Sequence, residues 1–174
     1  TKSNNSVARE GSEYETFDFS PLQKNQDEVI KISTLLKERK LKTAVYLGKD
    51  ADESTFKKVN IQNFGIIHLA THGFVNHGRA NLAGVAFARN PSSEEDGILY
   101  MDEIFSLHNR ANLICLSACE TGRGILQTGE GLIGLTRAFI YSGAQNLVVS
   151  LWKVEDESTA NLMVDFYSNL IKKR

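Results

Sequence analysis

The chain has 174 residues, 41% of them hydrophobic and 24% charged, a composition typical of one folded domain rather than of a disordered chain. The formal net charge is −1, so bulk electrostatics predicts neither direct nucleic-acid binding nor attachment to an acidic membrane surface. No apolar run has the length of a membrane span, and the polar N-terminal residues do not resemble a signal peptide. Because the first residue is Thr1 and not methionine, we expect the chain to belong to a longer polypeptide.

The first 19 residues are predicted to form a linker or a loosely held arm, followed by one domain over residues 20–174. The sequence "SPLQ" is typical of a helix start, with Ser20 as the N-cap and Gln23 completing a capping box. Apolar residues then recur at helical spacing. We therefore expect a helix that covers one face of the domain and ends near Lys40.

Several further apolar runs predict strands and helices in alternation. The run "TAVYLG" (43–48) predicts a strand, and "ADESTFKKVN" a short amphipathic helix. Continuous apolar runs without clean alternation predict strands buried on both faces, as in a parallel sheet, at "IIHLATH" (66–72), "NLICLSAC" (112–119) and "NLVVSLW" (146–152). Helices are predicted over "MDEIFSL", "EGLIGLTRAFIYSG" (with Gly143 as its C-cap) and "ESTANLMVDFYSNLIKKR". This order indicates an α/β sandwich with a largely parallel sheet.

The two cysteines are predicted to be free thiols. Cys115 and Cys119 lie on one predicted strand, where four extended residues separate them by roughly 13 Å, too far for a disulfide. Free thiols indicate a reducing, cytoplasmic setting. Because the sequence has no C-x-x-C pair or close Cys/His cluster, we predict no metal site and no cofactor.

The carboxyl ends of the predicted strands carry the residues suited to catalysis. In open α/β sheets ligands bind beyond these ends, where His72, Cys119 and the segment "KVED" (153–156) are expected. If the first two strands are neighbours, about 4.8 Å separates them, and the two side chains can converge. The histidine precedes the cysteine by 47 residues (119 minus 72), and caspases place theirs about 50 residues apart in the same order.

A cysteine beside an imidazole can act as a nucleophile, because the imidazole favours the thiolate. The backbone N–H of Gly73, which no side chain shields, can approach a substrate carbonyl and form an oxyanion hole with the N–H of Cys119. Taken singly, His72 or Cys119 is more simply explained as structural. Together, each at the end of a predicted strand and beside small residues, they favour catalysis.

The remaining histidines and cysteine are interpreted as structural. Cys115 lies in the middle of its strand, as a buried thiol does. His68 shares strand parity with His72 and is predicted to be a hydrogen-bonded core histidine. We expect His77 and His108 on the surface.

The quoted segments, together with "GEGLIGLTRAFIYSGAQNLVVSLWKVEDESTANLMVDFY", resemble the CHAT domain over roughly residues 22–172. This is a caspase-like cysteine peptidase domain, related to separase and often joined to tetratricopeptide repeats. The blocks "H-x-A-T-H-G", "SACETG" and "LW-x-V-x-D" carry the resemblance. It implies a caspase-like three-layer sandwich, with a mostly parallel central sheet between helices.

The resemblance also implies residue roles: His72 as proton carrier, Cys119 as nucleophile and Gly73 as an oxyanion donor. In separase-like relatives an acidic residue binds a basic substrate side chain, and this role would fall to Asp156, which implies cleavage after Arg or Lys. Asp156 is equally well explained as the N-cap of the last helix, and both interpretations stay open. The implied partners are a protein substrate and a fused or bound regulatory module.

One departure from the family concerns the C-terminus. CHAT domains usually continue into a further helix and an edge strand, whereas this chain stops at "IKKR". The domain is therefore expected to be incomplete at this end, either cut short or continued in a separate piece. Arg174 also suggests processing by an Arg- or Lys-specific protease.

Two other functions compete with peptidase activity. The stretch "GEGLIG" (129–134) matches the dinucleotide fingerprint G-x-G-x-x-G, which should directly follow a strand. Here ten residues separate Cys119 from Gly129, and Glu130 would repel phosphates, so we interpret the glycines as loop and helix-packing positions. The second alternative is a catalytically silent, caspase-like scaffold that binds partners.

Overall fold

The computed structural model describes residues 23–74, 83–117, 129–149 and 156–172. Within these ranges the strands form two three-stranded sheets, in the orders β1-β5-β6 and β2-β3-β4. The strands are β1 (Ile66–Leu69), β2 (Gly73–Phe74), β3 (Gly84–Ala86), β4 (Ile98–Tyr100), β5 (Leu113–Leu116) and β6 (Leu147–Val149). The α-helices are α1 (Gln23–Glu38), α2 (Glu53–Lys58), α3 (Met101–Ser106), α4 (Gly129–Tyr141) and α5 (Asp156–Lys172), with short 3-10 helices at Gly48–Asp50 and Ile61–Asn63.

The β1-β5-β6 sheet is parallel throughout; its middle strand is buried, and the strands on either side of it are mostly half-buried. β5 is its middle strand, and its pairing with β1 runs from Ile66–Leu113 to Leu69–Leu116. Successive side chains of β5 enter opposite cores: Ile114 belongs to one hydrophobic cluster and Cys115 to the other. Such two-sided burial explains why the sequence shows continuous apolar runs at these strands.

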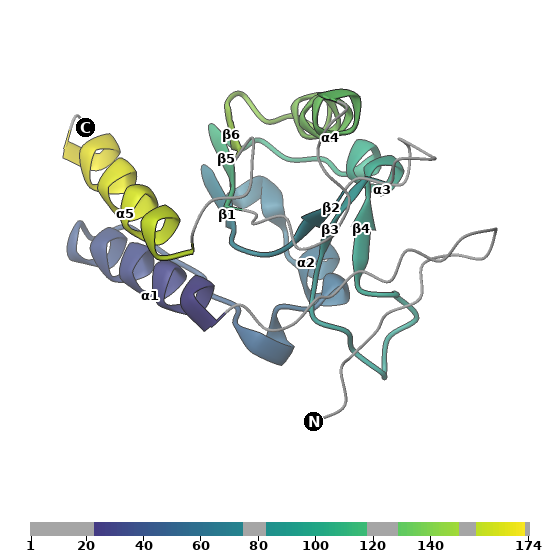
Figure 1. The fold of residues 1–174 in the computed structure, drawn as a ribbon, viewed down its shortest axis with the longest axis horizontal. Coiled ribbons are helices and arrows are strands. Elements are labelled where there is room, and N and C mark those ends of the chain that lie inside the picture. The colour runs from purple at the N-terminus through teal and green to yellow at the C-terminus, as the bar shows by residue number, and fades with distance from the viewer. Residues whose placement is uncertain (1–22, 75–82, 118–128, 150–155, 173–174) are drawn as a thin grey trace.

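Helices cover both faces of the parallel sheet, as Figure 1 shows. α1 and α5 pack together on one face, around the buried residues Ile32, Met163 and Tyr167. α3 and α4 lie on the other side, around Ile104 and Phe139. The predicted α/β sandwich with three layers and a mostly parallel sheet is therefore confirmed. Among the described residues, no helix combines the length and apolarity that crossing a bilayer requires.

One predicted strand does not form. Residues 41–47, which include the "TAVYLG" run, have no regular secondary structure, and a 3-10 helix begins at Gly48. Leu47 has extended backbone angles (φ −135°, ψ 152°), so the β-prone residues do favour an extended chain. The prediction was wrong because the segment pairs with none of the described strands, and a strand needs such a partner.

The short antiparallel sheet β2-β3-β4 was not predicted. Its strands are two or three residues long, too short to give a recognisable sequence period. β2 follows β1 after three residues, so it continues the polypeptide that leads out of the parallel sheet.

Asp52 is the N-cap of α2 and gives a first testable prediction. Its carboxylate accepts hydrogen bonds from Ser54 Oγ (2.6 Å), Thr55 N (3.0 Å) and Thr55 Oγ1 (2.8 Å). The bond from Ser54, followed by those from Thr55, lowers the pKa of Asp52 to about 2. We expect Asp52→Ala to reduce the free energy of unfolding by about 1–2 kcal/mol.

This contribution depends on pH with a defined sign. Because the pKa is lower in the folded state, the stabilisation is fully present above about pH 4 and is lost as the pH falls towards 2. Urea unfolding of the wild type and of Asp52→Ala from pH 7 to pH 2.5 measures the difference. Asp50→Ala, at an exposed aspartate two residues earlier, is the matched control, and an equal loss in both variants would contradict the capping role.

Candidate active site

His72 lies three residues beyond the end of β1, at the carboxyl edge of the parallel sheet. Only 5% of its surface is exposed. Its carbonyl oxygen accepts a hydrogen bond from Ala86 N (2.8 Å), and the hydroxyl of the preceding Thr71 donates to Ala86 O (2.6 Å). These hydrogen bonds to Ala86 of β3 fix this part of the backbone. His72 is therefore held beyond the carboxyl end of β1, where ligands bind in open α/β sheets.

Gly73 is the first residue of β2 and lies opposite Val85 of β3. The bond from Ala86 N to His72 O shows that His72 and Ala86 form the hydrogen-bonded pair of this antiparallel ladder. Gly73 and Val85 are then the non-hydrogen-bonded pair, so the N–H of Gly73 points away from β3. This orientation leaves the amide directed out of the hairpin, as an oxyanion donor requires.

Cys119 lies outside the described residues, so the structure does not test its predicted proximity to His72. β5 ends at Leu116, and the N–H of the next residue, Ser117, donates to Leu69 O (2.9 Å). Each β5 residue is numbered 47 higher than its β1 partner, as in Leu69–Leu116. Cys119 and His72 differ by the same 47, so both follow the last ladder pair by three residues.

Asp156 is the first residue of α5. It therefore occupies the first helical position rather than the N-cap. A carboxylate in the first turn is favoured by the helix dipole. The position of this side chain is not among those that the structure describes, and its predicted role in substrate binding is untested.

His68 has the predicted core role. Its Nε2 lies 2.8 Å from Glu28 Oε1 of α1, and its Nδ1 lies 3.2 Å from the Tyr167 hydroxyl of α5. Glu28 is 1% exposed and Tyr167 is fully buried. A carboxylate can only accept, so Nε2 donates to Glu28. His68 thus joins both helices of this layer to β1.

Cys115 is buried and reduced, as predicted. Burial raises the pKa of its thiol to about 11, and a hydrogen bond with Tyr167 offsets this only in part. A thiol with this pKa is almost entirely protonated at neutral pH and therefore a poor nucleophile. His108 is exposed, again as predicted, whereas His77 lies outside the described residues.

Glu28 was not predicted as the partner of His68, although the sequence contained a signal. It precedes the buried Ile32 by four residues, which places it on the buried stripe of the helix. A carboxylate on such a stripe needs a partner. His68 supplies it, but their separation of 40 residues hides the pair from local patterns.

The ammonium group of Lys57 forms ion pairs with three carboxylates. Its Nζ lies 2.7 Å from Glu53, 2.7 Å from Glu95 and 2.8 Å from Glu103. Burial by itself lowers the pKa of Lys57, but the hydrogen bonds to the three carboxylates raise it by more, so its pKa lies above the usual value. The three acidic groups are close enough to hold a cation, and the ammonium already occupies that role. The cluster binds α2, the 87–97 loop and α3 together.

The three glycines of "GEGLIG" all lie within α4. β5 ends at Leu116 and α4 begins at Gly129, so the fingerprint does not directly follow its strand. A Cβ at Gly134 would lie 2.8 Å from Met101 Sδ of α3. Gly134 therefore allows α3 and α4 to approach closely, which agrees with its interpretation as a packing position.

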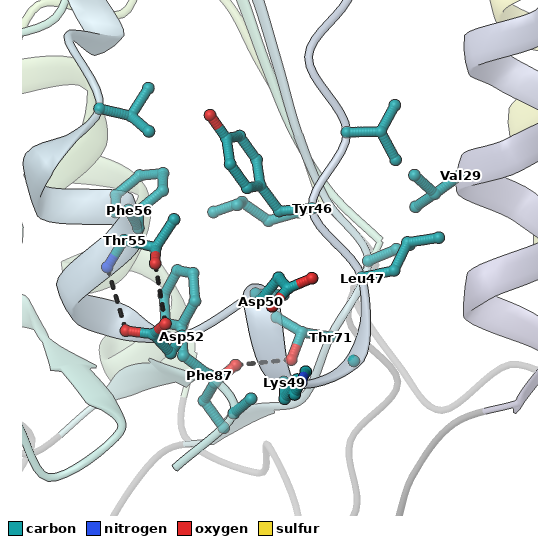
Figure 2. Close-up of a pocket in the computed structure, with 18 of the residues that line it drawn as sticks. Val29, Tyr46, Leu47, Lys49, Asp50, Asp52, Thr55, Phe56, Thr71 and Phe87 are labelled. Carbon is teal, nitrogen blue, oxygen red and sulfur yellow. Dashed lines mark hydrogen bonds between the residues drawn. The ribbon is translucent and has the colours of Figure 1, made fainter. Parts of the chain in front are cut away.

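A cavity of about 700 Å³ lies beside β1 and reaches His72. Its walls are α1, the 44–51 segment, α2 and the loop after β3. In Figure 2, Tyr46 points from this segment towards the helix that carries Phe56, while Leu47 lies on the side of Val29. The lining is mainly apolar, and no local sequence pattern reveals it because five separate segments build it.

Comparison with known proteins identifies the family. Residues 2–174 match the CHAT domain, a family of the caspase-like peptidase clan. Tetratricopeptide repeat protein 28 of Mus musculus is 34% identical over 74 residues, and that of Homo sapiens 32% identical over 74 residues. These matches cover 42% of this chain and only 3% of each relative. The parallel sheet between helices is consistent with a caspase-like fold, and the chain belongs to the CHAT domain family.

Proposed function

We propose that the chain is the peptidase domain of a CHAT-type cysteine endopeptidase, with His72 and Cys119 as its catalytic pair. The observation that carries the proposal is the ladder between β1 and β5. These strands are adjacent and parallel, and by residue number His72 and Cys119 each come three residues after a member of the last ladder pair, Leu69–Leu116. Parallel neighbours lie about 4.8 Å apart, so an imidazole and a thiol at matching positions are within reach of one another after small adjustments of the backbone.

The proposed reaction is acyl transfer to sulfur followed by hydrolysis. The Cys119 thiol gives its proton to His72, and the thiolate attacks the peptide carbonyl carbon. The N–H groups of Gly73 and Cys119 stabilise the oxyanion that forms. When the C–N bond breaks, His72 protonates the leaving amine. Water, activated by the same imidazole, then cleaves the thioester and restores the thiol.

The proposal also covers substrate specificity and the regulation of activity. Asp156 would bind the Arg or Lys side chain that precedes the scissile bond, since a carboxylate is the natural partner of a basic group. The substrate would be a cytoplasmic protein, and a fused or bound module would control access to the site. The name of the relatives, tetratricopeptide repeat protein, supports a repeat module as that partner.

Selective alkylation tests the proposal, because these 174 residues contain only two cysteines, whose peptides can be mapped separately. The full polypeptide is assayed with fluorogenic Arg and Lys peptides, then treated with iodoacetamide at pH 7.5 and mapped by mass spectrometry. We expect Cys119 to react much faster than Cys115, and turnover to fall in proportion to the modification of Cys119. Cys115, buried and protonated, is the internal control.

Two results would count against a peptidase. Turnover that survives complete alkylation of Cys119 would assign cleavage to another group or to a contaminant. No turnover of any Arg or Lys peptide, with and without the attached or bound module, would favour the silent scaffold.

A further inference from the structure

His72 lies in a short connection between the two sheets. β1 ends at Leu69, whose carbonyl oxygen accepts a hydrogen bond from Ser117 N (2.9 Å), and β2 begins at Gly73. The residues in between, 70–72, belong to no strand. Such a connection has no regular ladder of its own, so the orientation of His72 depends on the individual hydrogen bonds made there.

Ala86 of β3 is the anchor of this connection. It is 3% exposed, and β3 is the middle strand of its sheet. The next residue, Phe87, turns to the side of β4, where its N–H donates to Gly97 O (2.7 Å). Residues along an antiparallel strand alternate between the two neighbouring strands. The N–H and the C=O of Ala86 therefore both face the connection that carries His72.

The side chain of Thr71 makes one of the two bonds to this anchor. Ala86 N donates to His72 O (2.8 Å), and Thr71 Oγ1 donates to Ala86 O (2.6 Å), as Figure 2 shows for the threonine. In a regular hydrogen-bonded pair of strands both bonds come from the backbone. Here a hydroxyl takes part, so the attachment depends on which residue stands at position 71. Threonine suits it, because β-branching restricts χ1 and holds the hydroxyl in one direction.

We infer that Thr71 is a positioning residue for the two groups that follow it in the sequence, the imidazole of His72 and the N–H of Gly73. The inference rests on the proposed function, in which these groups are the proton carrier and an oxyanion donor. Thr71 acts through the backbone of the connection and takes no part in the bond changes of the reaction.

The two bonds to Ala86 orient both groups. The C=O of His72 and the N–H of Gly73 belong to one planar peptide group and point in opposite directions. Holding the carbonyl against β3 therefore directs this N–H away from β3. The Thr71 bond fixes the residue before His72 as well, so the direction in which the imidazole leaves the backbone is defined. Both groups act in the transition state, so their misplacement lowers kcat rather than raising KM.

Thr71→Val and Thr71→Ser separate the hydroxyl from the shape of the side chain. Valine has nearly the same shape but no O–H, so the buried Ala86 O loses this donor. Serine keeps the O–H and loses only a methyl group. Thr34→Val is the matched control, because Thr34 Oγ1 also donates to a backbone carbonyl, Ile30 O of α1 (2.9 Å), outside the site.

Hydrogen exchange gives a readout that needs no activity. We expect the Ala86 amide to exchange at least about tenfold faster in Thr71→Val than in the wild type, because its acceptor, His72 O, is held less firmly. Thr71→Ser and Thr34→Val should keep the wild-type rate. The amide of Phe87, which bonds to Gly97 O, should be unchanged in every variant and reports that the sheet is intact.

The full polypeptide is then assayed with fluorogenic Arg and Lys peptides. In Thr71→Val we expect kcat to fall at least about tenfold, because small misplacements of catalytic groups are costly, while KM changes by less than about twofold. Thr71→Ser should recover most of the loss, and Thr34→Val should show none. Thr71→Ala removes the same hydroxyl with less bulk and gives the same comparison if Thr71→Val does not fold.

The two readouts distinguish this inference from the proposed function. Faster exchange at Ala86, with no turnover even in the wild type, would contradict the peptidase and support Thr71 as the residue that orients His72 and Gly73. Wild-type turnover that Thr71→Val leaves unchanged would overturn the inference and leave the peptidase standing. A loss of kcat that Thr71→Ser does not recover, or that leaves Ala86 exchange unchanged, would also overturn it, because the hydroxyl would not be acting through this attachment.

Discussion

Replacing Cys119 or His72 with alanine is expected to lower kcat/KM for an Arg or Lys peptide by at least about 1000-fold. The double variant should fall no further than the worse single variant. The two residues act in one step, because the imidazole has no thiol to deprotonate in Cys119→Ala and the thiol has no base in His72→Ala. Groups that act as a unit lose their effect together, so the losses are not additive.

Controls separate this loss from unfolding. His108→Ala changes an exposed histidine and should keep full turnover. Thermal unfolding of each variant reports whether the fold survives, and the rate of Cys119 alkylation at pH 7.5 should fall in His72→Ala because the thiolate loses its partner. Losses that multiply in the double variant would show that the residues act independently and would contradict the catalytic pair.

Gly143→Ala is expected to reduce the free energy of unfolding by more than about 4 kcal/mol, which is exceptional for one methyl group. Gly143 follows α4 with φ +119°, a backbone conformation that is nearly restricted to glycine and costs about 1–3 kcal/mol for other residues. An added Cβ would also overlap the carbonyl oxygen of Asn109. That carbonyl belongs to the backbone of the loop before β5, so it cannot move aside as a flexible side chain can.

Gly48→Ala is the matched control for this prediction. Gly48 also has a positive φ (+55°), but a Cβ added there would meet no other atom within 4 Å. Its loss should therefore reflect the backbone conformation alone, about 1 kcal/mol. Urea unfolding of the two variants gives the difference. Equal losses would show that the contact with Asn109 contributes nothing.

Much of the fold could be predicted because the main strands contribute apolar side chains to a hydrophobic cluster on each face of the sheet. The continuous runs around Ile67, Ile114 and Val148 are characteristic of a parallel sheet, and all three lie in its strands. The predicted strand 66–72 was longer than β1, which ends at Leu69, because the apolar run continues into Ala70. Gly143 was predicted as a C-cap, and its positive φ after α4 confirms it.

The parts that escaped prediction depend on partners distant in the sequence. The 43–48 run has β propensity, but a strand also requires a neighbour, which no local pattern reveals. Lys57 contacts Glu95 and Glu103 across 38 and 46 residues. For the site itself, the sequence suggested His72 and Gly73 because both follow an apolar run. The structure adds the hydrogen bonds that orient them, while Cys119 and the carboxylate of Asp156 remain predictions.

The pairing of α1 with α5 has a consequence for biosynthesis. These helices come from opposite ends of the described chain, yet each covers apolar surface of the other and of β5. A nascent chain leaving the ribosome cannot complete this layer until α5 has emerged. Contacts so remote in sequence also slow folding, because a long loop must close before they form. During translation the apolar stripe of α1 therefore stays exposed until α5 has been made. Transiently exposed apolar surface of this kind is what chaperones bind.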